Sequence, residues 1–230
     1  MKHLILTLSL FLSVLSFSSA QTFEYNGLTY QIIKDVDEAT TFGTVYVTMS
    51  EGDDYQGDIV IPSGVQNGDG EFADKYKVTG IAEQAFSGCM SLRSVTLSPS
   101  ISHIGICAFM GCANLEEVII PTGNLKVIGD RAFAFSGLQK INIPSTVTTI
   151  DVVAFAQCWK LKEVTLPSNL KNIKLGAFNG CTKLVNITFP ASLKNIGSSA
   201  FQNCESLKKT RIPDGANVAP DAFSGCPLWE

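Results

Sequence analysis

Histidine is scarce in this sequence, and positive charge is not in excess. The 230 residues include only two histidines, His3 and His103, whereas catalytic triads and most zinc sites depend on imidazole groups. Seventeen Lys and Arg residues stand against twenty-one Asp and Glu residues, which gives a net charge of −4. Because phosphate binding needs a positive field, we expect no nucleic acid among the partners.

Long apolar runs are also rare. The longest spans Leu4 to Phe17 and is shorter than the about 20 residues that cross a bilayer. Small residues follow it up to Ala20, at the positions that a signal peptidase reads. This pattern predicts a signal peptide over residues 1–20, cleaved near Ala20, and Gln21 in place of cysteine argues against lipidation. We therefore expect a mature chain without a membrane span, either secreted or located at the cell surface or in the periplasm.

Charge divides the mature chain into two parts. Residues 21–83 hold twelve acidic and three basic side chains, whereas residues 84–230 hold nine and thirteen. This shift indicates two structural parts, which we predict to be a β-rich N-terminal cap over residues 21–80 and a repeat domain over residues 81–230. The dipeptide Asn26-Gly27 predicts a hairpin in the cap. The predicted cap strands, mutually antiparallel, are Phe23–Tyr25, Leu28–Ile33, Thr44–Thr48, Asp58–Ile61 and Tyr76–Thr79.

An Ala-Phe pair recurs through the second part at intervals of 22 to 24 residues. A Leu-x-x-Ile/Val-x-Leu/Ile segment follows most of these pairs. A period between 20 and 29 residues with such a segment is typical of leucine-rich repeats. The recurring phenylalanines give about seven rungs, the last incomplete: Phe86, Phe109, Phe133, Phe155, Phe178, Phe201 and Phe223.

The spacing within one rung predicts its geometry. Leu161, Val164 and Leu166 are placed to point inward from a short strand, while the residues between them face solvent on the concave side. The Ala-Phe pair would close the coil on a short helical turn on the convex side, with the phenylalanines stacked along the solenoid. One rung cannot bury its own apolar face, so only the stack is stable.

Six of the seven cysteines share one slot, three residues after the repeat phenylalanine. Ser136 occupies the same position in the third repeat, which indicates that the position needs a small side chain pointing into the core. We therefore predict free, buried thiols. A disulfide framework is the alternative in an exported protein, but parallel side-chain directions and an odd count disfavour it. Cys107 lies in another slot and is expected to be partly exposed. The six in register are Cys89, Cys112, Cys158, Cys181, Cys204 and Cys226.

The repeat Ile-Gly-x-x-Ala-Phe-x-x-Cys-x-x-Leu-x-x-Ile-x-Ile-Pro resembles that of the BspA-like leucine-rich repeat proteins of bacterial surfaces. The resemblance covers residues 81–230, and the segment before them is similar to the β-rich start of such proteins. It implies a right-handed solenoid with a parallel concave sheet and short convex helical turns. It also implies a role in adhesion or protein interaction.

Catalytic and metal-binding constellations are missing from the pattern. His103 is the one histidine of the mature chain, and it falls in a predicted turn where a surface polar residue is expected. The acidic clusters at residues 51–54 and 69–71 could hold calcium through carboxylates, but neither completes an EF-hand spacing. Solvated acidic loops are the interpretation that we favour. We therefore predict no enzyme, no metal and no cofactor.

The concave face is the candidate binding surface, since solenoids bind partners on extended concave sheets. Its charge changes from acidic near Glu116 to basic near Lys208, which suits a protein partner from a host or a bacterial surface. A glycan-binding accessory protein, with Trp159 and Trp229 as stacking residues, is the alternative. We also expect a monomer whose last residues, 227–230, cover the final rung. The candidate partner-binding residues are Glu116, Glu117, Ile119, Gln139, Lys140, Asn142, Lys162, Glu163, Thr165, Lys208, Lys209 and Arg211.

Overall fold

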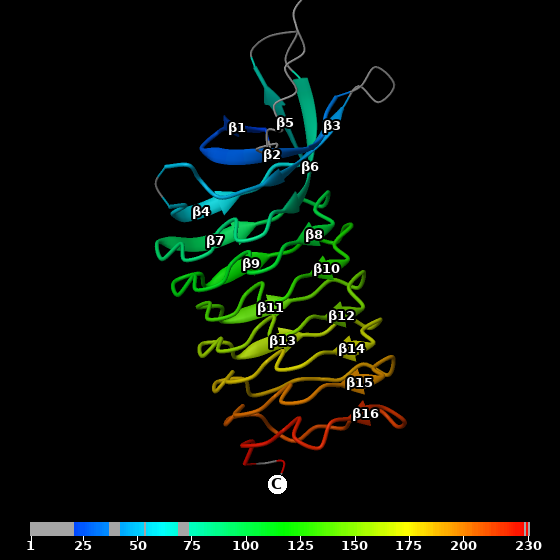
Figure 1. Cartoon of the computed structure of the whole chain (residues 1–230). Helices are drawn as coiled ribbons and strands as arrows, with labels where there is room; N and C mark the ends of the chain where they lie inside the picture. The colour runs from blue at the N-terminus through cyan, green and yellow to red at the C-terminus, as the bar shows by residue number, and fades with distance from the viewer. Residues whose placement is uncertain (1–20, 37–41, 53, 69–73, 228, 230) are drawn as a thin grey trace, which may run out of the picture.

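The chain forms a stack of coils that is closed at its N-terminal end by a β-rich cap (Figure 1). The structure is a computed structural model that describes residues 21–36, 42–52, 54–68, 74–227 and 229. The predicted signal peptide over residues 1–20 and the acidic cluster at residues 69–71 lie outside this range, as do Asp53 and Leu228. Within the described part, no helix has the length and apolarity of a membrane span.

One parallel sheet runs along the stack. Its strands are β4 (Gly57–Val60), β7 (Leu92–Thr96), β9 (Glu117–Ile119), β11 (Lys140–Asn142) and β13 (Glu163–Thr165), and they pair in this order. Each is one rung apart from the next, which confirms the parallel ladder predicted from the repeat. Inward residues such as Val95 and Ile141 are buried in the core.

This ladder weakens toward the C-terminal end. After β13 it continues only as an isolated bridge between Glu163 and Asn186. The repeat pattern also predicts a strand over residues 207–212 of the last complete rung, and this prediction is wrong, because the structure assigns no strand there. At Thr210 this rung holds a polar, partly exposed side chain where the earlier rungs bury valine or isoleucine, but the rung before it also lacks a full strand although Ile187 is buried.

A second parallel ladder runs beside the first, as Figure 1 shows, in segments that the sequence suggested to be turns. Its strands have two residues each, and one side chain of most pairs, such as Ile104, Ile150 and Ile173, is buried. A column of isoleucines thus supplies a second inner wall of the coil. The strands are β8 (His103–Ile104), β10 (Val127–Ile128), β12 (Thr149–Ile150), β14 (Asn172–Ile173), β15 (Asn195–Ile196) and β16 (Asn217–Val218). The ladder has two hydrogen-bonded parts, because β8 pairs with β10 and β12 pairs on through β14 and β15 to β16, whereas β10 and β12 belong to different sheets.

The Ala-Phe segments form non-helical turns, so the expectation of short convex helices is not confirmed. The residues two before and two after the phenylalanine adopt positive φ in most rungs, as with Arg131 at 53° and Phe135 at 59°. Positive φ at two positions four residues apart interrupts any right-handed helix of L-residues. The turn N–H groups instead donate to the next rung, as Phe133 does to the carbonyl of Ala154 at 2.8 Å.

The core is a continuous column of aromatic rings. From Phe86 to Phe223, the repeat phenylalanines stack with centroids 4.9 to 5.3 Å apart and interplanar angles of at most 8°. Tyr55 covers the N-terminal end of this column at 4.8 Å from Phe86, and Trp229 covers the other end. The predicted phenylalanine stack is therefore confirmed.

The cap is a mixed sheet that is continuous with β8 and β10 of the second ladder. Strand β1 (Thr22–Tyr25) pairs antiparallel with β2 (Leu28–Lys34) around the Asn26-Gly27 turn, and β2 pairs antiparallel with β3 (Gly43–Val47). Strand β3 pairs parallel with β6 (Asp74–Ile81), so the strand predicted near residues 76–79 is present but its predicted orientation is wrong. Strand β5 (Gly64–Asn67), absent from the prediction, pairs antiparallel with β6. Because β6 also pairs parallel with β8, the cap and the repeats share hydrogen bonds.

Candidate functional site

The first ladder presents an outward surface that we call the strand face. It comprises the outward-pointing residues of β4, β7, β9, β11 and β13 and the residues next to them. Parallel pairing aligns these residues in rows, so that Ser94 lies beside Glu117, Glu117 beside Lys140, and Lys140 beside Glu163. A neighbouring row carries Thr96 beside Ile119, whose side chain is 47% exposed.

Opposite charges alternate along this face and pair with one another. Lys140 Nζ lies 2.9 Å from Glu117 Oε1, and hydrogen bonding to Glu117 raises the pKa of Lys140. Arg93 Nε donates to Asp58 Oδ1 at 2.9 Å, and Ser94 Oγ donates to the same oxygen at 2.7 Å. These hydrogen bonds lower the pKa of Asp58 to about 2. The Asp58 carboxylate is therefore ionised at neutral pH.

Two hollows bring together nine of the twelve predicted residues. One, of about 250 Å³, is lined by Glu117, Ile119, Lys140, Asn142, Glu163 and Thr165, together with their neighbours along the strands. The other, of about 370 Å³, is lined by Glu116, Glu117, Gln139, Lys140, Lys162 and Glu163. The two share three residues, so they form one shallow groove across β9, β11 and β13.

The remaining three predicted residues do not join this groove. Lys208, Lys209 and Arg211 are exposed and lie within residues 207–212, to which the structure assigns no strand. Arg211 lines a separate hollow with Phe189 and pairs with Asp214 at 2.8 Å. The sequence suggested that charge changes gradually from acidic to basic along the face. In the structure, acidic and basic side chains instead form pairs, such as Asp58 with Arg93 and Glu117 with Lys140, and only the last rung is mainly basic.

The sequence placed Asp58–Ile61 among the antiparallel cap strands, and this prediction is wrong, because β4 belongs to the parallel sheet of the strand face. Asp58 and Val60 of β4 extend its rows by one rung, because β4 pairs in parallel with β7. The signal was present in Asp58-Ile-Val-Ile-Pro62, which has the same strand-then-proline form as the repeats.

The cysteine ladder is part of the core. All seven cysteines are free thiols; six are buried and Cys107 is partly exposed, as predicted. Five of the buried thiols donate to the phenylalanine carbonyl of the preceding rung, as Cys181 Sγ does to Phe155 O at 3.2 Å. Burial raises the pKa of Cys112 to about 12. Among the described residues, no three His, Cys, Asp or Glu side chains gather as a metal site would require.

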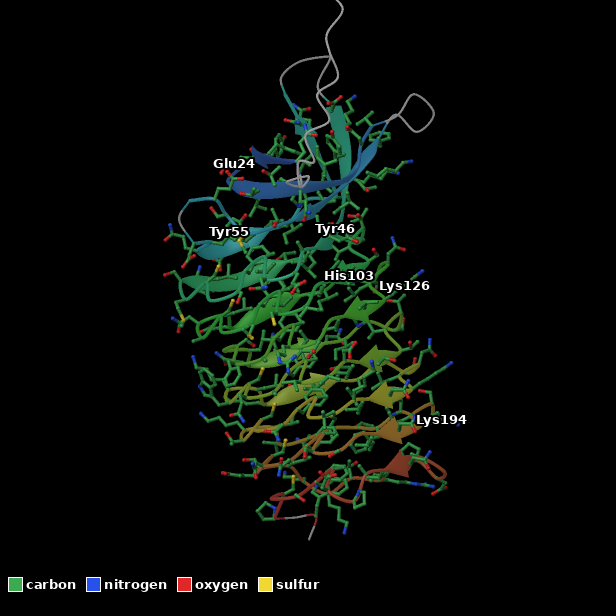
Figure 2. All side chains as sticks on the ribbon, viewed as in Figure 1. Glu24, Tyr46, Tyr55, His103, Lys126 and Lys194 are labelled. Atoms are coloured by element: carbon green, nitrogen blue, oxygen red, sulfur yellow. The ribbon has the colours of Figure 1, made fainter. Side chains whose placement is uncertain are left out.

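His103 is in a strand, contrary to the expected turn. It belongs to β8, its ring stacks against Tyr46 with centroids 5.9 Å apart, and burial lowers its pKa. Figure 2 shows both residues at the junction of the cap and the second ladder, away from the strand face. Of the two tryptophans, Trp229 is stacked on Phe223 and Trp159 is 38% exposed, so they do not combine into one stacking platform.

Comparisons with known proteins agree with this architecture. The crystal structure of the pneumococcal vaccine antigen PcpA matches with a TM-score of 0.68 and 30% identity, covering 85% of this chain and 51% of that one. A leucine-rich repeat protein from Bacteroides ovatus has a TM-score of 0.54 and 27% identity, covering 89% and 62%. The T. pallidum leucine-rich repeat protein has a TM-score of 0.55 and 26% identity, covering 82% and 96%.

The chain thus spans about half of the pneumococcal antigen and 62% of the Bacteroides ovatus protein. No curated protein matches it. The profile of the BspA type leucine-rich repeat region matches six copies over residues 71–174 and 104–230. That range contains every repeat phenylalanine and cysteine of the stack, and the chain accordingly belongs to the BspA-type leucine-rich repeat family.

Proposed function

We propose that this chain is an exported, non-enzymatic interaction module that binds a protein partner through the groove on its strand face. The observation that carries the proposal is the groove across β9, β11 and β13. There, alternating charges surround the exposed side chain of Ile119. An exposed apolar residue within a polar rim is the arrangement that protein interfaces use.

The location and the biological role extend the same proposal. The predicted signal peptide supports export, and the similarity to a pneumococcal vaccine antigen supports a surface position in contact with the host. Adhesion to a host or bacterial surface protein is the role that fits both. We expect the mature chain to act as a monomer.

The test uses a partner captured by residues 21–230 from surface extracts, identified, and then purified. The double substitution Lys140→Glu with Lys162→Glu reverses two charges within the groove. We expect it to weaken binding of the purified partner by about tenfold or more, because close charge pairs contribute strongly to interfaces.

The matched control reverses two lysines outside the groove. Lys171→Glu with Lys194→Glu changes charge equally but lies beside the second ladder, so binding should change by less than about twofold. If both double variants lost affinity equally, the loss would result from the change in net charge and not from the groove. If Lys140→Glu with Lys162→Glu left the affinity unchanged, the partner would bind at another surface.

A further inference from the structure

Strand β4 leaves one edge without a neighbour in the part of the chain that the structure describes. It is the terminal strand of its sheet and pairs only with β7. Gly57 N–H donates to Ser91 O at 2.8 Å and Ile61 N–H to Thr96 O at 2.9 Å. In a parallel ladder the backbone groups of alternate residues point the same way. Those of Asp58 and Val60 therefore point away from β7.

A groove follows this free edge. It has a volume of about 340 Å³ and lies between β4 and the hairpin turn that joins β1 to β2. Asn26, Gly27 and Leu28 form the hairpin wall, and Asp58, Ile59 and Val60 form the strand wall. The groove occupies the position that one more strand of the ladder would take.

The burial of Ile59 shows that this side of the rung is open. Its equivalents in the next rungs, Val95 and Val118, are buried, whereas Ile59 is only partly buried although it points toward the same core. On the opposite surface of β4, Val60 is 72% exposed. An added strand would cover the edge between these two apolar side chains.

Charge selects the occupant. Asp54 and Asp58 line the groove, and Glu51 lies on the loop before Asp54. The Asp58 carboxylate is paired with Arg93, so Asp54 and Glu51 supply the attraction for a basic ligand. Figure 2 shows Glu24 on the hairpin and Tyr55 beside β4 on this side of the molecule. No lysine or arginine is among the described residues that line the groove. The surrounding segment, residues 21–83, has nine more acidic than basic side chains.

We propose that the β4 edge is a second binding site, which takes an extended, basic peptide segment of a partner protein as an additional strand. The N–H and C=O groups of Asp58 and Val60 bind its backbone, Ile59 and Val60 contact its apolar side chains, and Asp54 and Glu51 attract its lysines. Backbone pairing on a sheet edge supplies affinity, and the flanking side chains supply specificity. This site is independent of the groove across β9, β11 and β13.

The same charges disfavour a second copy of the chain as the occupant. Pairing two β4 edges would bring the two acidic segments together, which like-charge repulsion opposes. Pro62, two residues after the end of β4, also limits the length over which two edges could pair.

The experiment measures binding of a fluorescent peptide with the repeat Lys-Val-Lys-Val-Lys-Val to residues 21–230 by anisotropy. Val60→Pro removes only an N–H that faces the groove, and proline is tolerated on an edge strand. We expect it to weaken binding by about tenfold or more, whereas Val60→Ala, which keeps the N–H group, changes binding by less than about threefold. A Glu-Val peptide of equal length should not bind.

Because Val60→Pro could weaken binding by disturbing the fold, a second measurement uses the unsubstituted chain. Saturating Lys-Val peptide should slow amide hydrogen exchange at Asp58 and Val60. The groove variant Lys140→Glu with Lys162→Glu should bind the peptide no more weakly, which separates this site from the proposed function.

Three results would overturn the proposal. The first is no saturable peptide binding up to about 1 mM. The second is equal binding by Val60→Pro and the parent chain. The third is a chain that binds no peptide but associates with itself, with Val60→Pro abolishing that association. This result would assign the β4 edge to a second copy of the chain.

Discussion

The indole of Trp229 lies flat against the ring of Phe223, with centroids 3.9 Å apart and planes within 1° of parallel. The repeat rings below it are spaced at about 5 Å, so this contact is the closest in the column. Trp229 therefore covers the last rung, as the sequence predicted for the segment that contains it.

Replacing Trp229 with alanine should lower the free energy of unfolding by about 2 kcal/mol. The loss stays below that of a fully buried aromatic residue because Trp229 is only partly buried. Exposure of Phe223 should also promote association at micromolar concentration. Denaturant melts and light scattering measure both effects. Trp159→Ala is the control, expected within about 0.5 kcal/mol of the parent; equal effects of the two substitutions would refute the covering role.

Phe155→Ala should lower the free energy of unfolding by about 3–5 kcal/mol, because it removes a fully buried ring from the middle of the stack. Phe135 offers a matched control within the neighbouring turn, since its ring is 49% exposed. Phe135→Ala should cost less than about 1 kcal/mol. A loss below about 1 kcal/mol for Phe155→Ala in denaturant melts would mean that the ring column does not stabilise the fold.

Two tyrosine hydroxyl groups of the cap should respond oppositely to removal. Tyr55 Oη accepts from Thr29 N–H at 3.0 Å and donates to Thr48 O at 2.8 Å, so Tyr55→Phe should destabilise by about 1–3 kcal/mol. Tyr30 Oη is buried and has no hydrogen-bond partner among the described residues. Burial raises its pKa. Tyr30→Phe should therefore leave stability unchanged or increase it in urea titrations; the reverse order would contradict these bonding assignments.

The thiols should be counted before and after unfolding. Native protein should react slowly with a thiol reagent at neutral pH, because six cysteines are buried and burial disfavours the reactive thiolate, as at Cys112. After denaturation without reductant, all seven should react. Recovery of a single free thiol would establish three disulfides and contradict the ladder.

The carboxyl group of Asp58 should titrate near pH 2. Its pKa is lower in the folded chain than in the unfolded chain, because Arg93 and Ser94 donate hydrogen bonds to the carboxylate. The stabilisation is therefore complete above the ordinary pKa of aspartate and is lost as the pH falls through about 2. NMR titration of the side chain measures the midpoint. Arg93→Ala should move it upward, and an unchanged midpoint would exclude Arg93 as the cause.

Much of the repeat architecture could be predicted from the sequence because it depends on spacing. The interval between Phe109 and Phe133 sets the rung, and the position of Cys112 three residues after Phe109 places a small donor against the previous turn. Nine residues that line the groove across β9, β11 and β13 were predicted from the alternation of inward and outward side chains along each strand.

The turn conformations and the strand pairings of the cap could not be predicted from residue types alone. Gln84 and Arg131 adopt positive φ although neither is glycine, so the turns were predicted as helices. The parallel pairing of β3 with β6 and the stacking of Tyr55 on Phe86 join residues more than 30 positions apart, with no repeat to indicate the partner. The groove beside β4 exists because the hairpin of β1 and β2 does not cover the free edge of β4, and residue spacing does not predict this.

The direction of the turn hydrogen bonds gives the coil a polarity. Each turn presents carbonyl oxygens toward the preceding rung and N–H groups toward the following one, as Phe109 N–H does to Ala132 O at 2.7 Å. Every internal junction is therefore chemically alike, and a junction built in the opposite sense would oppose donor to donor. Evolution can accordingly lengthen or shorten such a molecule by duplicating or deleting whole repeats in frame, whereas gaining part of a repeat would break the register of every bond around it.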